Sequence, residues 1–362
     1  MGLGKKKILS QGAAGAVVNT DNFQTLTYTG TCSTQSTNSL SSQSGTLNFQ
    51  PDFIWFKSRV SGHMHQLYNS ISGVNLCLNT GVGSIGNRTG NEPEFDTSSA
   101  YGGSGGDLRS FNSNGFTIGA CVFGGVNENT FAHVAWCWYA PTAESISASG
   151  SRVASTIKKN VDAGFSIVTF TTPSSNQNFQ IGHGLGVKPD MVIMKKRNDS
   201  GAWLFWHKDL SDESYHLFLN STAGESGLTQ DSRIWGQQSF TSTTISTSTG
   251  YSYDVNDTVV SYCFANIAGY QKVDKYIGNS GTNAITTGFQ PRFVLMKNTA
   301  NGYSWIMQDS VRGANKFLYP NLNNAEVFSG THITSFDSNG FTLGNNADVN
   351  LSGNTYIYLA IA

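Results

Sequence analysis

Charge is scarce in this chain of 362 residues. Only 12 % of the residues are charged, and 22 Lys and Arg nearly balance 23 Asp and Glu. Nucleic-acid binding depends on clustered basic residues that neutralise phosphates, and Lys5-Lys6-Lys7 is the only run of three lysines in this chain. The composition therefore excludes nucleic acid as the expected partner.

Long apolar runs are also missing. No stretch approaches the 18 consecutive apolar residues that a membrane-spanning helix needs, so no membrane insertion is expected. The start, "MGLGKKKILSQGAAGAVV", is basic, but Ser10-Gln11-Gly12 interrupts its apolar stretch, which argues against an export signal. We expect residues 1–21 to form an N-terminal arm or anchor.

The five cysteines are odd in number and form no C-x-x-C pair. Cys137 and Cys263 lie within apolar runs, as small core residues do. Scattered free thiols are typical of proteins that fold in a reducing cytosol, so a secreted disulfide scaffold is not expected.

Catalytic and cofactor motifs are few. "GVGSIG" at 81–86 matches a dinucleotide-binding fingerprint, but the following "NRTGNEPEF" cannot begin the helix that this motif requires. The closest carboxylate cluster, Glu92, Glu94 and Asp96, lies in a loop that no other part of the chain repeats. A glycoside hydrolase needs two opposed carboxyl groups, so we expect no enzyme and no cofactor.

The histidines include "HMH" at 63–65, His183, His207 and His216. No Cys or carboxylate stands near them at the spacing of a metal site. We interpret these histidines as loop residues at a rim and expect no metal.

What the chain does contain is 40 glycines, seven prolines and 12 % aromatic residues. Many glycines between short runs of aromatic and β-branched residues indicate short strands that are joined by tight turns. Enough aromatic rings are present to fill several sandwich cores.

One segment is written three times, as "FQPDFIWFK" at 49–57, "VKPDMVIMK" at 187–195 and "FQPRFVLMK" at 289–297. Proline is tolerated at the first residue of a strand, and apolar residues on both faces indicate a central strand. A closing lysine can lay its methylenes on the core and keep its ammonium in water. The predicted landmarks of this strand are Pro51, Trp55 and Lys57, then Pro189 and Lys195, then Pro291 and Lys297.

Other landmarks recur in the same order. Each copy begins with a strand led by an aromatic residue: Phe23, Phe165 or Tyr270. "SFNSNGFTIG" (110–119) and "SFDSNGFTLG" (335–344) predict a strand, a tight Asn-Gly turn and a strand, and the middle copy has only a degenerate "SFTSTTISTS" (239–248). Each copy closes on an alternating apolar strand, such as "TYIYLAIA".

The order of landmarks predicts an all-β chain of tandem antiparallel β-sandwich domains with very little helix. The expected divisions are an arm at 1–21, a first copy at 22–140, a linker at 141–163, a second copy at 164–267 and a third copy at 268–362. The linker lacks landmarks and is either extended or forms a short helix near Val153–Lys159. Copies two and three have no spacer, so their junction should be stiff.

Exposed aromatic residues in polar loops are what a sugar-binding face uses, because rings stack on pyranoses. Trp235 in "SRIWGQQ" and Tyr251 and Tyr253 in "TGYSYDV" are the candidates for such a face. The alternative is that these rings cap the core.

Several of these segments resemble repeat-built structural proteins of tailed bacteriophages, notably phages of marine bacteria. The resemblance lies in "ASGSRVASTIKKNVDAGFSIVTF", "IGHGLGVKPDMVIMKKRN", "VVSYCFANIAGYQKV", "GFQPRFVLMK" and "YIYLAIA". It implies a protein of the virion surface with concanavalin-like or jelly-roll domains, made in the host cytoplasm and forming homo-oligomers, trimers among them.

Three functions follow as alternatives. The first is a tail fibre or tail-associated component that attaches to host-surface glycans and docks on other virion proteins through its N-terminal arm. The second is a capsid decoration or knob protein that covers or cements the shell. The third is a polysaccharide-degrading tailspike, for which the sequence offers no carboxylate pair.

Overall fold

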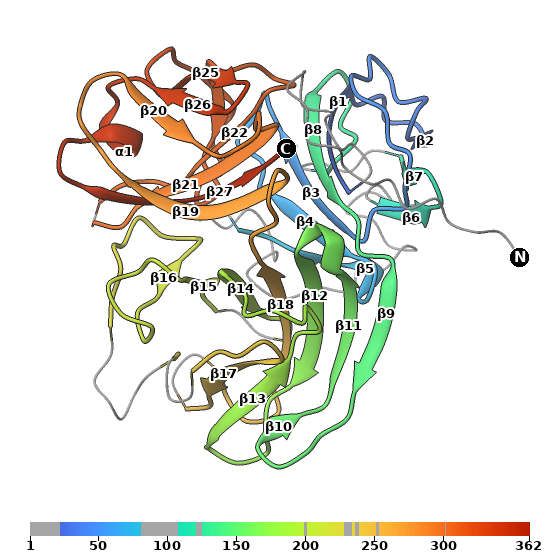
Figure 1. Ribbon diagram of the computed structural model, residues 1–362. Helices are drawn as coiled ribbons and strands as arrows, with labels where there is room; N and C mark the ends of the chain where they lie inside the picture. The colour runs from blue at the N-terminus through green and yellow to red at the C-terminus, as the bar shows by residue number, and fades with distance from the viewer. Residues whose placement is uncertain are drawn as a thin grey trace, which may run out of the picture.

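The computed structural model describes residues 22–80, 108–120, 125–198, 201–227, 234–235, 239–250, 253–300 and 302–362. The chain is an all-β protein, as predicted (Figure 1). Within the described residues, helix is limited to the single turns η1 (Val161–Ala163) and α1 (Ala347–Asn350).

The first copy contains a five-stranded sheet in the order β1-β8-β3-β4-β5 and a three-stranded sheet in the order β2-β7-β6. We call the larger sheet of each copy its main sheet and the other its small sheet. The strands are β1 (Phe23–Thr29), β2 (Gln35–Ser36), β3 (Phe53–Ser58), β4 (Gln66–Asn69), β5 (Gly73–Leu78), β6 (Leu108–Asn112), β7 (Gly115–Ile118) and β8 (Ala132–Trp138).

The second copy has a main sheet in the order β16-β15-β14-β18-β12-β11-β9 and a small sheet in the order β10-β13-β17. Its strands are β9 (Thr142–Ile146), β10 (Arg152–Val153), β11 (Ser155–Asn160), β12 (Phe165–Thr171), β13 (Asn178–Gly182), β14 (Met191–Lys196), β15 (Leu204–His207), β16 (Leu217–Phe218), β17 (Thr244–Ser248) and β18 (Thr258–Phe264). β10 runs parallel to β13, and the other pairs are antiparallel.

The third copy has a main sheet in the order β19-β27-β21-β22-β23-β24 and a small sheet in the order β20-β26-β25. Its strands are β19 (Gln271–Ile277), β20 (Asn283–Thr286), β21 (Phe293–Asn298), β22 (Ile306–Asp309), β23 (Lys316–Leu318), β24 (Val327–Phe328), β25 (Ile333–Asp337), β26 (Gly340–Leu343) and β27 (Thr355–Ile361).

The three main sheets share one plan. In each, the opening strand pairs with the closing strand, which pairs with the proline-led strand, which pairs with the strand after it. This common register defines equivalent positions, so that Phe53, Met191 and Phe293 correspond. The repetition predicted from the sequence is thus a repetition of strand order.

The prediction that residues 141–163 form a linker, either extended or with a short helix near Val153–Lys159, was wrong: they form β9, β10 and β11 and then the single turn η1. β9 and β11 extend the main sheet of the second copy, and β10 joins its small sheet. Along β11, Ser155 and Ile157 are buried whereas Thr156 is exposed, which is the two-residue period of a strand. This hairpin also adds two strands to one side of the second copy.

The two copies of the "S-N-G-F" motif form hairpins, as predicted, but the turn is shifted by one residue. Asn112 pairs with Gly115, so that Ser113 and Asn114 form the turn and the glycine begins β7. A Cβ on Gly115 would lie 2.4 Å from the Thr37 side chain, because β2 packs closely against it. The glycine is therefore required by close packing between strands as well as by the turn.

The proline-led strands are buried on both faces, as their apolar pattern predicted. Phe53 and Trp55 face a core that also contains residues of copies two and three, whereas Ile54 and Phe56 face the interior of the first sandwich. In the shared core, the ring centroids of Phe53 and Tyr262 lie 4.4 Å apart. The three copies are therefore lobes of one body packed around a common centre (Figure 1).

Hydrogen bonds at equivalent positions join the lobes in a cycle. In each copy, the residue directly before β4, β15 or β22 contacts a backbone oxygen of a neighbouring copy, located at the last residue of β5, β16 or β23 or directly after it. Trp203 donates its indole N–H to the oxygen of Asn79 at 2.8 Å, and Trp305 donates to Phe218 at 3.0 Å. His65 completes the cycle, with Nε2 3.0 Å from the oxygen of Tyr319. Copy two thus contacts copy one, copy three contacts copy two, and copy one contacts copy three.

A second cycle of contacts between the copies is made by the last residues of β4, β15 and β22. Asn69 contacts the Tyr262 hydroxyl at 3.5 Å, and His207 Nε2 lies 3.5 Å from the backbone oxygen of Tyr358. Asp309 accepts from the indole N–H of Trp136 at 3.0 Å. Each of these contacts reaches the closing strand of the neighbouring copy, so the three copies form a closed ring with pseudo-threefold order.

Candidate binding pocket

The lysines that end the proline-led strands are buried, which corrects the prediction that their ammonium groups remain in water. Lys57 is 1 % exposed, and Lys195 and Lys297 are 0 % exposed. Each ammonium donates to the backbone oxygen of the next residue, at 2.6–2.8 Å, and Lys57 also donates to Ser61 at 3.1 Å. The chain therefore bends back over the lysine instead of leaving it at the surface.

Burial changes the charge behaviour of these lysines. It lowers the pKa of Lys57 to about 7, with a further contribution from Arg312, and lowers that of Lys297 to about 8. The carbonyl contacts hold the ammonium form in place. Because equivalent lysines of all three copies make the same contact, the arrangement belongs to the architecture.

The predicted sugar-binding aromatics are not at the surface. Trp235 is 0 % exposed and Tyr253 is 2 % exposed, and both lie in the interior core of the second sandwich. Trp235 packs edge-on against Phe240, with centroids 5.6 Å apart. Tyr251 lies outside the described residues. The alternative interpretation, in which such rings cap the core, is correct for Trp235 and Tyr253.

All seven histidines are buried, so the interpretation as rim residues was wrong. Burial lowers the pKa of His133 and His207 to about 3 and that of His183 and His216 to about 4. The backbone N–H of Asp209 donates to Nδ1 of His207, and that of Leu185 donates to Nδ1 of His183. An accepting Nδ1 fixes the neutral ring with its proton on Nε2.

The cysteines also differ from expectation at one position. Cys32 is disulfide-bonded, and its partner lies outside the described residues. Cys77, Cys137 and Cys263 are free and buried, as predicted for the latter two.

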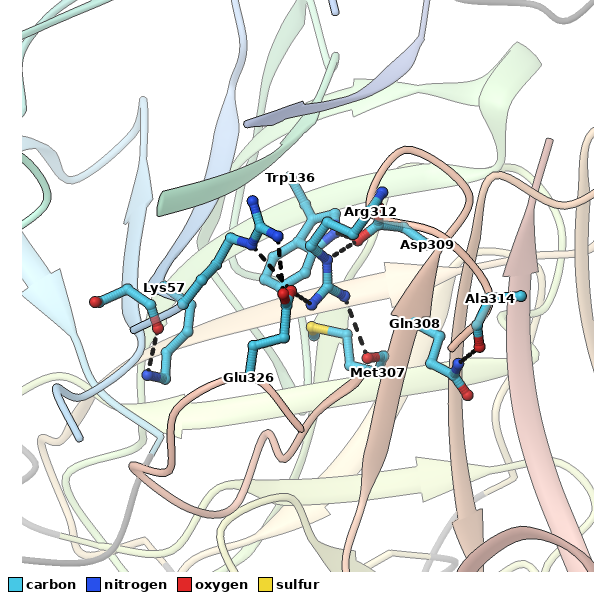
Figure 2. A network of polar contacts seen from close by, with 10 residues as sticks. Lys57, Trp136, Met307, Gln308, Asp309, Arg312, Ala314 and Glu326 are labelled. Atoms are coloured by element: carbon cyan, nitrogen blue, oxygen red, sulfur yellow. Dashed lines mark hydrogen bonds and ion pairs between the residues drawn. The ribbon is translucent and has the colours of Figure 1, made fainter. Parts of the chain in front are cut away.

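A buried charged network joins copies one and three (Figure 2). The Arg312 guanidinium lies between the carboxylates of Asp309 and Glu326, at 2.5 and 2.9 Å, and over the Trp136 ring at 5.1 Å. Glu326 also binds Arg59 of the first copy through two hydrogen bonds, at 2.8 and 3.0 Å. Burial would raise the pKa of Glu326, but the two arginines lower it overall. Both arginines and both carboxylates of the network are therefore paired within the protein.

A hollow of about 470 Å³ opens between copies one and two. Its wall includes the rings of Phe49 and Tyr139, whose centroids are 5.2 Å apart, and Tyr139 stays partly exposed. Phe49 lies four residues before β3, and Tyr139 directly follows β8, so segments that flank two neighbouring strands of one sheet position the rings. The other lining residues are Asn48, Gln50, Asp52, Ser113, Pro141 and Lys158.

An ion pair forms the floor of this pocket. Asp52 is 1 % exposed and accepts from the Ser70 hydroxyl at 2.6 Å and from the Ala140 N–H at 2.8 Å. Lys158, on β11 of the second copy, lies 3.3 Å from Asp52 and is 23 % exposed. Burial raises the pKa of the Asp52 carboxyl above its usual value, although Ser70, Ala140 and Lys158 each act to lower it. The pocket thus combines an aromatic wall, a paired carboxylate and ammonium, and a rim of amide and hydroxyl groups.

A second hollow, of about 400 Å³, lies on the main sheet of copy two. It is lined mainly by Ser and Thr hydroxyls of β9, β11 and β12, with Arg197 at one side. Phe170, the aromatic residue of its lining, is 5 % exposed, so the hollow lacks an accessible ring.

Among the described residues, no three or more His, Cys, Asp or Glu side chains are grouped so that they could hold a metal ion. In the same part of the chain, no helix has the length and apolar character needed to cross a membrane. The predicted carboxylate cluster at 92–96 and the "GVGSIG" motif lie outside the described residues.

Comparison with known proteins gives one match. No curated protein and no solved structure is significantly similar to the chain. The model of one family, a domain of unknown function named DUF7483, matches residues 18–362 and so spans all three copies as a single unit. The chain therefore belongs to the DUF7483 family.

Proposed function

We propose that this chain is a non-enzymatic structural component of a tailed-bacteriophage particle, carried on the tail, where it contributes to attachment to glycans of the host surface. The observation that carries the proposal is the closed ring of three copies. Side chains at equivalent positions, such as Trp203, Trp305 and His65, are used to join one copy to the next. A body that is braced in this way suits a protein that transmits or resists force.

The proposal that the chain belongs to a bacteriophage particle is supported by the sequence resemblance. The segments that resemble tail-associated phage proteins coincide with strands of the main sheets, including β12, β14, β18, β21 and β27. The proposed partners are other particle proteins, reached through residues 1–21, and further copies of the chain. The proposed location is the virion surface, after synthesis in the host cytoplasm.

One observation favours a capsid decoration protein as the second candidate. The three lobes form a compact body around a shared core, whereas a fibre shaft would be elongated (Figure 1). A compact body covers a lattice of capsid subunits as readily as it forms a tip on a tail.

Localisation in the particle tests both candidates. The chain should appear in purified virions by mass spectrometry, and a cryo-EM map of the particle should place its three-lobed density on the tail. Density distributed over the capsid lattice would establish the decoration role instead, and absence from the virion would refute both. Release of reducing sugar from host polysaccharide by the purified chain would contradict the non-enzymatic role.

A further inference from the structure

We propose that the pocket between copies one and two, built around Tyr139 and the Asp52–Lys158 ion pair, binds an uncharged saccharide unit. The inference rests on the proposed attachment function and names the site and ligand class through which attachment occurs. It places the sugar contact far from Trp235 and Tyr253, which are buried.

Internal repetition provides the first argument. Features that all three copies share are explained by the common architecture, whereas a feature of one copy needs another reason. The position after the closing strand is Tyr139 in copy one but Ala265 and Ala362 in copies two and three. Both alanines are buried within intact sheets, so folding does not require an aromatic side chain at this position.

The inserted hairpin provides the second argument. Copies two and three are joined directly, with only residues 265–270 between β18 and β19. Between copies one and two the chain adds β9 and β11, and β11 places Lys158 against Asp52. The pocket therefore depends on two departures from the repeat, an aromatic residue on one side and an extra strand on the other.

The chemistry of the lining indicates the ligand. Asp52 and Lys158 are paired at 3.3 Å, so their charges offset each other and favour a ligand without net charge. The amides of Asn48 and Gln50 and the hydroxyl of Ser113 offer donors and acceptors at the rim. A partly exposed tyrosine ring supplies an apolar face. A ligand with many hydroxyl groups and one apolar face is a saccharide.

The size of the pocket agrees with this class. Small-molecule sites typically measure about 300–1,000 Å³ and combine an apolar wall with a few placed polar groups. At about 470 Å³ the pocket lies in the lower part of this range. Its partial exposure suits one unit of a longer surface polysaccharide better than a molecule enclosed on all sides.

Saturation-transfer NMR on the full chain tests the proposal. The probes are glucose, galactose, mannose, N-acetylglucosamine and N-acetylgalactosamine, with anionic glucuronic acid and cationic glucosamine as charged comparisons. At least one neutral sugar should receive saturation, and Tyr139→Ala should weaken its affinity about fivefold or more through the lost ring contact. Lys158→Met should also weaken it, because methionine has a similar length but no hydrogen-bond donor.

The chain contains its own control for folding. Tyr139→Ala introduces the residue that already occupies the equivalent positions of the other copies, so the variant should still fold cooperatively, with a somewhat lower unfolding temperature because the ring no longer packs against Phe49. Phe328→Ala removes a ring that is 72 % exposed and lies outside the pocket, and it should leave sugar binding unchanged. Equal binding by Tyr139→Ala and the parent, stronger transfer to the charged probes, or no transfer to any neutral sugar would each overturn the proposal.

The outcome is separable from that of the proposed function. A chain located on the tail that binds no neutral sugar would retain its structural role and lose this site. A chain that binds sugar through Tyr139 but is absent from the particle would retain this site and lose the proposed function.

Discussion

Copies one and two are consecutive in the chain, whereas copies one and three are separated by the whole of copy two, and the two junctions differ in chemistry. Between copies one and two, Trp203 donates to Asn79 and Asn69 contacts Tyr262, so both contacts are neutral. Between copies one and three the equivalent positions are His65 and Asp309, and Arg312, Glu326 and Arg59 surround them.

The difference follows from what each junction must achieve. Copies one and three are brought together across a longer stretch of chain, which raises the entropic cost of closure. The three junctions also share one geometry, so the pairing of the wrong copies has to be disfavoured. Among the described residues, the other two junctions carry the single ion pairs Lys158–Asp52 and Lys275–Asp209, whereas the closing junction carries a network of two arginines and two carboxylates, which distinguishes it.

The largest expected effect comes from breaking this network. Arg312→Met removes the partner of Asp309, whose side chain is 0 % exposed, and should lower the free energy of unfolding by about 3–5 kcal/mol. Asn69→Ala, at the position of copy one that corresponds to Asp309, should cost only about 1 kcal/mol. Chemical denaturation followed by circular dichroism measures both values.

The double variant Arg312→Met/Asp309→Asn provides the control. It removes both charges and keeps an acceptor for the indole N–H of Trp136, so it should regain part of the loss. Equal costs for Arg312→Met and Asn69→Ala would show that the charged junction is no different from the neutral one.

Lowering the pH should lower the free energy of unfolding, because the buried histidines are neutral in the folded chain. Their pKa values in the folded chain, about 3–4 for four of them, lie below the usual 6.5, so the unfolded chain binds more protons as the pH falls below 6.5. Stability therefore falls with pH, by about 1.4 kcal/mol per pH unit for each such histidine, until the folded pKa is reached.

His207→Asn sharpens this prediction, because asparagine occupies the equivalent position of copy one. The variant should lose about 2 kcal/mol less than the parent chain between pH 6.5 and pH 5. Urea titrations at several pH values measure the two slopes. Parallel slopes would mean that the pKa of His207 is the same in the folded and the unfolded chain.

Removing the hydrogen bonds of His65 or Trp305 to the neighbouring copy should lower the free energy of unfolding by smaller amounts, which differ between the two residues. His65 accepts from the Trp55 indole N–H at 2.8 Å and reaches Tyr319, whereas Trp305 makes one equivalent hydrogen bond, to Phe218. Trp305→Phe should cost about 1 kcal/mol, and His65→Phe about twice as much because it also leaves the Trp55 donor without a partner. Thermal and chemical unfolding of the two variants should rank them in this order, and the reverse order would contradict it.

Local patterns were sufficient to predict the repeated proline-led strands, although not β9, β10 and β11. The alternation after Pro51 placed Phe53 and Trp55 on one buried face and Ile54 and Phe56 on the other, as the structure shows. Burial that depends on distant segments was not predictable. Lys57 and Trp235 stand beside polar residues in the sequence, but loops or neighbouring strands cover them in the fold.

The candidate pocket shows the same division. Alignment of the closing strands could have revealed Tyr139, because the other two copies have alanine at that position. Nothing local connects Lys158 with Asp52, since their contact requires β11 to be a strand that extends the second sheet toward the first copy. Tyr139 could therefore be identified from the sequence, whereas the contact between Lys158 and Asp52 could not.

The smallest effect should come from the rim of the charged junction. Arg59 is 18 % exposed at its side chain and shares Glu326 with Arg312, so Arg59→Gln leaves Glu326 with a buried partner. The expected loss is about 0.5–1 kcal/mol and should shrink as salt is added. The matched variant at the junction of copies two and three is Lys275→Gln, whose ammonium is 51 % exposed and lies 3.7 Å from Asp209. It should leave the unfolding midpoint unchanged, and a loss equal to that of Arg59→Gln would show that charge at the closing junction has no special weight.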